Sequence, residues 1–160
     1  MLQTEYADDE IIVVSNRQPY SHERRGDEVV VTQPASGLVT ALEPVLRAAS
    51  GTWVAHGSGS ADQQVSDRDG CVQVPPEQPS YTLRRLWLTP EQVKGYYEGF
   101  ANEGLWPLCH IAHVRPVFRA EDWRHFVDVS QRFADAVVKS ARRADPLVLV
   151  QDYHMPLVPQ

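Results

Sequence analysis

Ile11-Ile12-Val13-Val14-Ser15-Asn16-Arg17 is the stretch that decides the fold of this chain. Its first four residues are apolar and β-branched, without polar alternation, which is typical of a strand buried on both faces inside a parallel sheet. Pro19 then prevents regular continuation of the strand. Because ligands bind at the carboxyl ends of strands in such sheets, we expect Arg17 to lie at a binding site.

Other strand-like runs follow along the sequence. Leu147–Val150 is a second fully apolar run, and it closes on Gln151-Asp152-Tyr153-His154. Weaker runs are Val29–Thr32, Thr52–His56 and Tyr81–Leu88, with Val72 and Val74 marking one more weak strand. The polar stretch Ser21–Asp27 is expected to be a hairpin loop or flap between strands.

Helical patterns separate these runs. A helix is expected to open at Gly37, with Ser36 as N-cap and Gly51 as the stop, and another at Thr89-Pro90-Glu91. The best helical pattern runs from about Ala120 to Arg143. Strands interleaved with helices predict an α/β fold, with a Rossmann-like, largely parallel sheet and helices on both faces.

The composition of the 160 residues is ordinary for one globular domain, with 42% hydrophobic and 22% charged residues. A net charge of -6 argues against a nucleic-acid partner. Met1–Glu10 is polar and acidic, unlike a secretion signal, and no apolar run is long enough to cross a membrane, so a cytoplasmic protein without a membrane partner is expected. Cys71 and Cys109 match no metal or redox spacing and are expected to be free thiols, and no cofactor or metal is expected.

Two features could carry chemistry. The turn at Ser36-Gly37 precedes a helix, where free backbone N–H groups favour a phosphate, and Arg17 could bind the same kind of anion or form a surface salt bridge. Tyr96, Tyr97, Phe100 and Trp106 form an aromatic cluster. Such rings can stack on a pyranose, or they can be core packing at a helix end.

Five segments in this order resemble the trehalose-6-phosphate synthase family of retaining glycosyltransferases. They are Val13–Arg17, Ser36–Leu42, Tyr96–Asn102, Leu105–His110 and Val150–His154. The resemblance covers about residues 11–160, after a polar segment at residues 1–10. It implies a GT-B architecture, of which this chain is the N-terminal, acceptor-binding half without the donor-binding half.

The resemblance also implies roles for individual residues. Arg17 is expected to grip the acceptor phosphate, Asp152 to bind acceptor hydroxyls, and Tyr97, Trp106 and Trp53 to form or adjoin the acceptor pocket. Gly37, with Ser36, is expected to approach the donor diphosphate. No catalytic residue is assigned within the chain, and the chain alone is expected to be inactive.

The implied reaction moves glucose from a nucleotide-sugar such as UDP-glucose to glucose-6-phosphate, giving trehalose-6-phosphate. Ser36 stands where the family usually has glycine, His56 where it has a second tryptophan, and Gln151 where it has histidine. Two alternatives therefore stay open: an enzyme using glycerol-3-phosphate, as in glucosylglycerol-phosphate synthases, and an inactive sugar-phosphate-binding domain. Without the donor-binding half, the surface that normally meets it would be exposed, which would favour a homo-oligomer.

Overall fold

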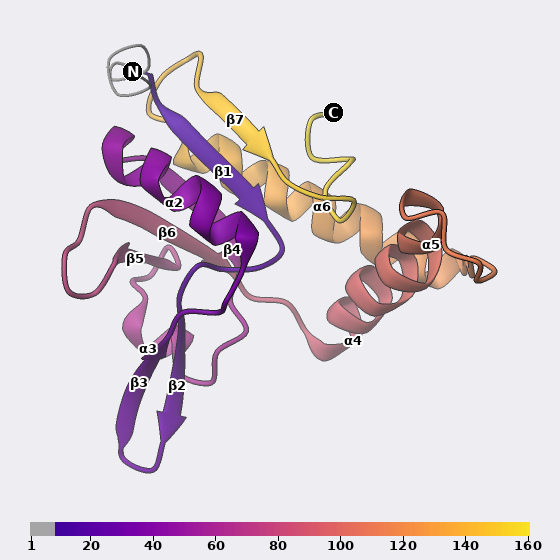
Figure 1. The fold of residues 1–160 in the computed structure, drawn as a ribbon, viewed down its shortest axis with the longest axis horizontal. Helices are drawn as coiled ribbons and strands as arrows, with labels where there is room; N and C mark the ends of the chain where they lie inside the picture. The colour runs from indigo at the N-terminus through magenta and orange to yellow at the C-terminus, as the bar shows by residue number, and fades with distance from the viewer. Residues whose placement is uncertain (1–8) are drawn as a thin grey trace.

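The computed structural model describes residues 9–160 (Figure 1). The elements in chain order are β1 (Ile11–Ser15), β2 (Ser21–Arg25), β3 (Glu28–Thr32), α2 (Gly37–Ala49), β4 (Thr52–His56), α3 (Asp62–Val65), β5 (Cys71–Val74), β6 (Tyr81–Leu86), α4 (Pro90–Gln92), η1 (Val93–Leu105), α5 (Trp106–Cys109), α6 (Ala120–Ser140) and β7 (Leu147–Val150).

Strand β1 lies inside a five-stranded sheet of order β5-β6-β4-β1-β7. It pairs in parallel with β4 on one side and with β7 on the other, and β4 pairs in parallel with β6. Only the edge strand β5 runs antiparallel to its neighbour. All five residues of β1 are buried, as its unbroken apolar run predicts. The predicted α/β fold with a largely parallel sheet is therefore confirmed.

Helices cover both faces of the sheet (Figure 1). On the α2 face, Trp53, Tyr81 and Leu83 pack with Val39 and Leu46 of the helix. On the opposite face, α6 contributes Phe126, Val129 and Phe133 to a second core cluster.

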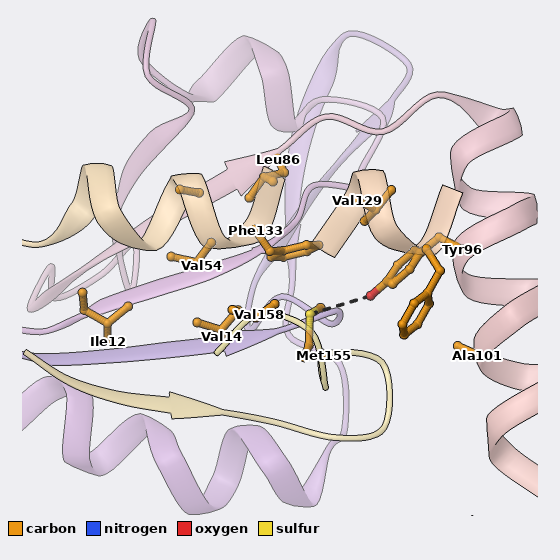
Figure 2. Packing of buried hydrophobic residues seen from close by; sticks show 12 residues of the cluster. Ile12, Val14, Val54, Leu86, Tyr96, Ala101, Val129, Phe133, Met155 and Val158 are labelled. Carbon is orange, nitrogen blue, oxygen red and sulfur yellow. Dashed lines mark hydrogen bonds between the residues drawn. The ribbon is translucent and has the colours of Figure 1, made fainter. Parts of the chain in front are cut away.

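The second cluster also joins the helical region to the end of the chain. Figure 2 shows Tyr96 of η1 pointing at Met155, with its hydroxyl 3.9 Å from the Met155 sulfur. Val158 belongs to the same cluster. The segment after β7 is thereby packed against the core, which fixes the position of the residues that precede Met155.

Helix α2 begins at Gly37 with Ser36 as N-cap, as the sequence predicts. Its end differs from the prediction, because Ser50 and not Gly51 adopts the left-handed conformation, with φ 48°. Gly51 is needed for space instead: a Cβ there would lie 2.5 Å from the Ile11 carbonyl oxygen and 2.4 Å from Leu46 Cδ2. Any larger side chain would push α2 away from β1.

The predicted flap at Ser21–Asp27 is wrong, since Ser21–Arg25 forms strand β2. It pairs with β3 in a separate two-stranded hairpin that projects away from the main sheet (Figure 1). The sequence SHERR lacks apolar alternation, so nothing local signals a strand.

A buried polar cluster at the base of the hairpin holds it in place. The Asp62 carboxylate accepts hydrogen bonds from the backbone N–H of His22 (2.8 Å) and of Gly59 (2.7 Å) and from Gln18 Nε2 (2.7 Å). The Arg85 guanidinium lies 3.2 Å from the same carboxylate and donates to Gln18 Oε1 (2.8 Å) and to the Tyr20 carbonyl (3.1 Å). We call Gln18, Tyr20, His22, Gly59, Asp62 and Arg85 the Asp62 cluster. It joins the hairpin to β6 through charge-assisted hydrogen bonds.

The helical region begins with a capping box, in which Thr89 and Gln92 cap each other. Short α4 continues into η1, a π-helical stretch, and then α5. Helix α6 ends at Ser140, slightly before the predicted Arg143. π-Helical turns are rare and are frequently found at functional sites.

Glu10 ends the predicted polar segment 1–10, of which residues 1–8 lie outside the described part of the chain. The Glu10 carboxylate is buried and accepts from the backbone N–H of Arg142 (2.9 Å) and of Arg143 (2.7 Å). Burial alone would raise the pKa of Glu10, but these hydrogen bonds outweigh it and lower that pKa below its ordinary value. Glu10 therefore joins the start of β1 to the end of α6.

No helix among residues 9–160 is long and apolar enough to cross a membrane. Cys71 and Cys109 are both free thiols.

Candidate functional site

A cavity of about 310 Å³ opens at the carboxyl ends of β1 and β7. Four segments far apart in the sequence meet there: the end of β1, the start of α2, the η1–α5 helices and the turn after β7. The lining residues are Ser15, Asn16, Arg17, Ser36, Leu38, Tyr97, Trp106, His110, Asp152, Tyr153 and His154. The position is the one expected for a ligand site in an open parallel sheet.

Arg17 provides the positive charge of this cavity. Its backbone is held by Ser15, whose hydroxyl donates to the Arg17 carbonyl (2.6 Å). Its side chain is exposed, and its guanidinium makes no hydrogen bond or ion pair within the part of the chain that the structure describes. An arginine held by its backbone, with its planar donors unused, is suited to bind a phosphate or carboxylate.

The N-terminus of α2 adds backbone donors to the same cavity. Ser36 is the N-cap, but its hydroxyl makes no capping bond, and its carbonyl accepts from Thr40 N–H (3.0 Å). The first-turn N–H groups lack intrahelical acceptors, and the helix dipole is positive at this end. Together these favour an anion beside Ser36 and Leu38.

Aromatic rings form a continuous wall along the cavity. Tyr97 stacks on His154, with ring centroids 5.0 Å apart and planes at 18°, and His154 lies 4.0 Å from Tyr153. Trp106 stacks on His110 at 4.8 Å and 22°, and His110 meets Tyr153 edge-on at 5.8 Å. Such a wall offers apolar faces to the C–H surface of a sugar ring and polar edges to its hydroxyls.

The π-helical stretch η1 positions one side of this wall. Its i→i+5 hydrogen bonds bring residues five apart close together, which suits Tyr97 and Asn102. Asn102 Oδ1 accepts from the Tyr153 hydroxyl (2.8 Å), while Tyr97 stacks on His154. η1 therefore touches the turn after β7 at two points and fixes the distance between the two sides of the cavity.

Asp152 supplies the carboxylate of the cavity from an unusual backbone conformation. Its φ is 75°, in the left-handed region that residues other than glycine rarely occupy. The carboxylate accepts from Tyr153 N–H (2.8 Å), and the side chain is 50% exposed. Strained conformations of this kind are concentrated at functional sites.

His154 lies beneath Asp152 and is almost fully buried. Burial lowers the pKa of His154; the Asp152 carboxylate, 3.4 Å from Nδ1, opposes this, and the Arg17 charge adds to the lowering. The imidazole is therefore neutral at neutral pH. Burial also raises the pKa of Tyr153 to about 12, so its hydroxyl stays protonated.

Two buried polar atoms of lining residues lack a hydrogen-bond partner within residues 9–160. They are Nε2 of His154 and Oδ1 of Asn16. A buried polar atom without a partner costs free energy unless a ligand or water satisfies it. The cavity is therefore polar in its inner part as well as at its mouth.

Of the seven residues assigned from the sequence, five line this cavity: Arg17, Ser36, Tyr97, Trp106 and Asp152. Gly37 is the first residue of α2, next to the lining residue Ser36, and open space surrounds the position of its missing Cβ.

Trp53 does not line the cavity, because its side chain is fully buried in the core on the α2 face. Its indole N–H donates to the Ser15 hydroxyl (2.8 Å), which in turn donates to the Arg17 carbonyl. The contact of Trp53 with the site is therefore indirect, through a buried chain of two hydrogen bonds.

Asn16, His110, Tyr153 and His154 line the cavity although sequence reasoning gave them no role. Each lies inside a segment that resembles the glycosyltransferase family, within four residues of a residue that was assigned. The sequence therefore located the segments that form the site, but it did not indicate which further residues of those segments face the cavity.

No group of three or more His, Cys, Asp or Glu side chains in the described range 9–160 is arranged to hold a metal ion.

The model of glycosyltransferase family 20 matches residues 9–160. Among curated relatives, the trehalose-6-phosphate synthase of Mycobacterium ulcerans (strain Agy99) is 40% identical over 156 residues, which is 97% of this chain and 30% of that protein. The chain therefore spans about 30% of the length of the curated relatives it matches.

Solved structures show the same fold. An Escherichia coli protein bound with UDP-2-fluoro glucose matches with a TM-score of 0.64 at 25% identity, over 91% of this chain and 28% of that one. The trehalose-phosphate synthase of Burkholderia xenovorans in complex with glucose-6-phosphate matches with a TM-score of 0.63 at 23% identity, over the same shares, 91% and 28%.

Proposed function

This chain belongs to glycosyltransferase family 20, and we propose that it forms the acceptor-binding part of an enzyme that moves glucose from a nucleotide-sugar to a sugar phosphate. The observation that carries the proposal is the guanidinium of Arg17, which is unpaired within residues 9–160 and lines an aromatic-walled cavity. A sugar phosphate needs one strong anion ligand and a ring-binding surface beside it, and the cavity has both.

We propose glucose-6-phosphate as the acceptor and UDP-glucose as the donor, with trehalose-6-phosphate as the product. The support comes from relatives: one is a trehalose-6-phosphate synthase, and two solved structures hold glucose-6-phosphate and a UDP-glucose analogue. Of the three departures from the family pattern, His56 and Gln151 do not line the cavity, and Ser36, which does, lies at the start of α2, on the side assigned to the donor. The cavity itself therefore gives no reason to change the acceptor.

In this proposal Arg17 binds the acceptor phosphate, Tyr97 and Trp106 hold the sugar ring, and Asp152 accepts hydrogen bonds from sugar hydroxyls. The start of α2 at Ser36-Gly37 approaches the donor diphosphate. The reaction retains the configuration at the transferred carbon, and the leaving diphosphate takes the proton of the attacking hydroxyl. This chain then contributes positioning, and catalysis depends on geometry and on stabilising the leaving group.

The test is Arg17→Ala, with binding and stability measured together. Losing the charge-assisted fork should weaken glucose-6-phosphate binding by roughly tenfold to a hundredfold. Arg17→Lys should recover only part of the affinity, because an ammonium lacks the planar fork. The melting temperature should stay nearly the same, since this side chain is exposed.

Glycerol-3-phosphate serves as the comparison ligand. Binding of glucose-6-phosphate but not of glycerol-3-phosphate supports the ring-binding role of the aromatic wall. Equal binding of the two would favour the glycerol-3-phosphate alternative. If Arg17→Ala melts several degrees lower yet binds glucose-6-phosphate as the parent does, Arg17 is structural and the proposal is wrong.

We expect no glucosyl transfer by the 160-residue chain alone, because it matches only about 30% of the length of its relatives. We also expect self-association, because Leu108, Ile111, Val114 and Phe118 leave an apolar surface exposed. Glucosyl transfer by the purified chain would contradict the first expectation. A strictly monomeric mass at high concentration would contradict the second.

A further inference from the structure

A second cavity, of about 330 Å³, lies between the β5–β6 edge of the sheet and helix α6. It shares no lining residue with the cavity at the ends of β1 and β7. Its walls come from the loop before β5, from β6 and from one flank of α6. Its volume lies at the lower end of the range of small-molecule sites.

Basic side chains dominate this second cavity. Arg68, Arg84, Arg132 and Lys139 line it, against the two carboxylates of Asp69 and Asp135. A fifth lining cation, Arg85, is already neutralised within the Asp62 cluster. A positive cavity is notable in a chain whose net charge is -6.

None of the other four lining cations forms an ion pair within residues 9–160. Arg132 donates to the Trp87 carbonyl (2.6 Å) and to Gln92 Oε1 (2.8 Å), which are neutral acceptors. Arg84 donates to the Asp69 carbonyl (3.3 Å), but its Nε is buried without any acceptor. The cations outnumber the two carboxylates and are not paired with them, and a buried donor without an acceptor costs free energy, so a bound anion would stabilise this arrangement.

We propose that this cavity binds a small diphosphate-bearing anion, at a site separate from the acceptor cavity. Against the two carboxylates the four cations leave a net charge of about +2, and they are spread over opposite walls of the cavity, so that two linked phosphate groups can bridge them. The guanidinium of Arg84 on the sheet and the ammonium of Lys139 on α6 reach such a ligand from opposite walls, one as a fork and the other as a point charge. Arg132 is already hydrogen-bonded at the entrance to α4 and adds its charge from there.

The test is calorimetric titration of the chain with inorganic pyrophosphate at low ionic strength. In the Arg17→Gln background, which removes the anion ligand of the acceptor cavity, we expect one saturable site that Arg84→Gln and Lys139→Gln each weaken by about tenfold, as loss of a charge-assisted hydrogen bond predicts. Arg124→Gln is the matched control, because it removes the same charge from an exposed position of α6 that does not line the cavity. The Arg17→Gln background separates this site from the acceptor cavity, because pyrophosphate should still saturate the second cavity there.

ADP and inorganic phosphate identify the ligand further. Affinity for ADP equal to that for pyrophosphate means that the linked phosphates alone are recognised, and tighter binding of ADP means that a nucleoside is recognised too. The proposal is overturned if pyrophosphate does not saturate, if inorganic phosphate binds as tightly, or if Arg124→Gln weakens binding as much as Arg84→Gln. It is also overturned if Arg17→Gln abolishes the binding, since the pyrophosphate then occupies the acceptor cavity.

Discussion

Arg17 and Gln18 are neighbours in the chain but belong to two contrasting polar regions. Gln18 lies in the Asp62 cluster, where each side-chain amide and carboxylate oxygen has a partner and Asp62 and Arg85 are fully buried. Arg17 lies at the acceptor cavity, where its guanidinium and the buried Nε2 of His154 have no partner in residues 9–160. Where polar groups satisfy each other they hold the fold, and where they are left unsatisfied they are available to a ligand. Substitutions in the two regions should therefore change different measurements.

The largest effect is expected for Asp62→Ala. It leaves the buried Arg85 without a counter-charge, which costs about 3–5 kcal/mol of the free energy of unfolding. For a chain of this size that corresponds to a melting temperature lower by roughly 10 °C. Urea denaturation measures it, with Asp27→Ala in the exposed hairpin turn as the control. If Asp62→Ala does not fold, Asp62→Asn gives the milder test, and a parent-like urea midpoint for either variant would show that the cluster does not hold the fold.

Ser15→Ala should affect both measurements, because Ser15 links the core to the cavity. The change leaves the buried indole N–H of Trp53 without an acceptor, which costs about 1–3 kcal/mol of stability. It also releases the carbonyl of Arg17, so sugar-phosphate affinity should fall a few-fold. In the double variant Ser15→Ala/Trp53→Phe the stability loss should be smaller than the sum of the two single losses. If the two stability losses add, the hydrogen bond between Trp53 and Ser15 contributes no coupling energy.

Trp106→Ala tests the aromatic wall, with a smaller expected effect. Losing one ring face should weaken sugar-phosphate binding by roughly three- to tenfold, while stability changes little because Trp106 is 40% exposed. Trp123→Ala is the matched control, since Trp123 is 43% exposed but lies outside the cavity. Equal losses of affinity in the two variants would remove Trp106 from the site.

Acidification gives the smallest and most gradual effect, through His22 of the Asp62 cluster. Burial, and then the Arg85 charge, lower the pKa of His22 against the opposing pull of Asp62. Below about pH 6.5 the unfolded chain then binds a proton that the folded chain does not, so the free energy of unfolding falls as the pH falls. Arg85 Nη2, which lies 2.9 Å from His22 Nδ1, donates to that atom, so protonation breaks a hydrogen bond as well. His22→Gln should therefore reduce the fall in melting temperature between pH 7 and pH 5. His110→Gln, which changes an exposed histidine, should leave that fall unchanged.

The two regions also differ in how far the sequence predicts them. Strands β1 and β7 are unbroken apolar runs, and they pair in parallel as such runs predict, with β1 inside the sheet and β7 at its edge. Strand β2 has no such pattern, because its place depends on the Asp62 cluster, whose members lie some forty residues apart along the chain. Long-range polar contacts of this kind leave no local periodicity.

The cavity shows the same limit in another form. The segments that carry Arg17, Tyr97 and Asp152 could be identified from the sequence, and the structure brings them together. Trp53 lies in strand β4, and the sequence does not indicate which face of the sheet its side chain occupies. The pairing of β4 with β1 places it opposite Val13, and both side chains belong to the core cluster on the α2 face. The π-helical winding of η1 likewise has no signal in residue spacing, although it decides which side chains reach the cavity.

The left-handed backbone at Asp152 makes position 152 subject to two separate filters in a saturation mutagenesis experiment. Asparagine and glycine pass the conformational filter, since both tolerate φ near the observed 75°, but they remove the carboxylate. Glutamate keeps the carboxylate but is less stable than aspartate in the left-handed backbone conformation. Valine and isoleucine fail both filters. Selection for folding alone should therefore enrich asparagine and glycine at this position, and selection for sugar-phosphate binding should enrich aspartate alone. Comparing the two enrichment profiles separates what the turn requires from what the ligand requires at a single residue.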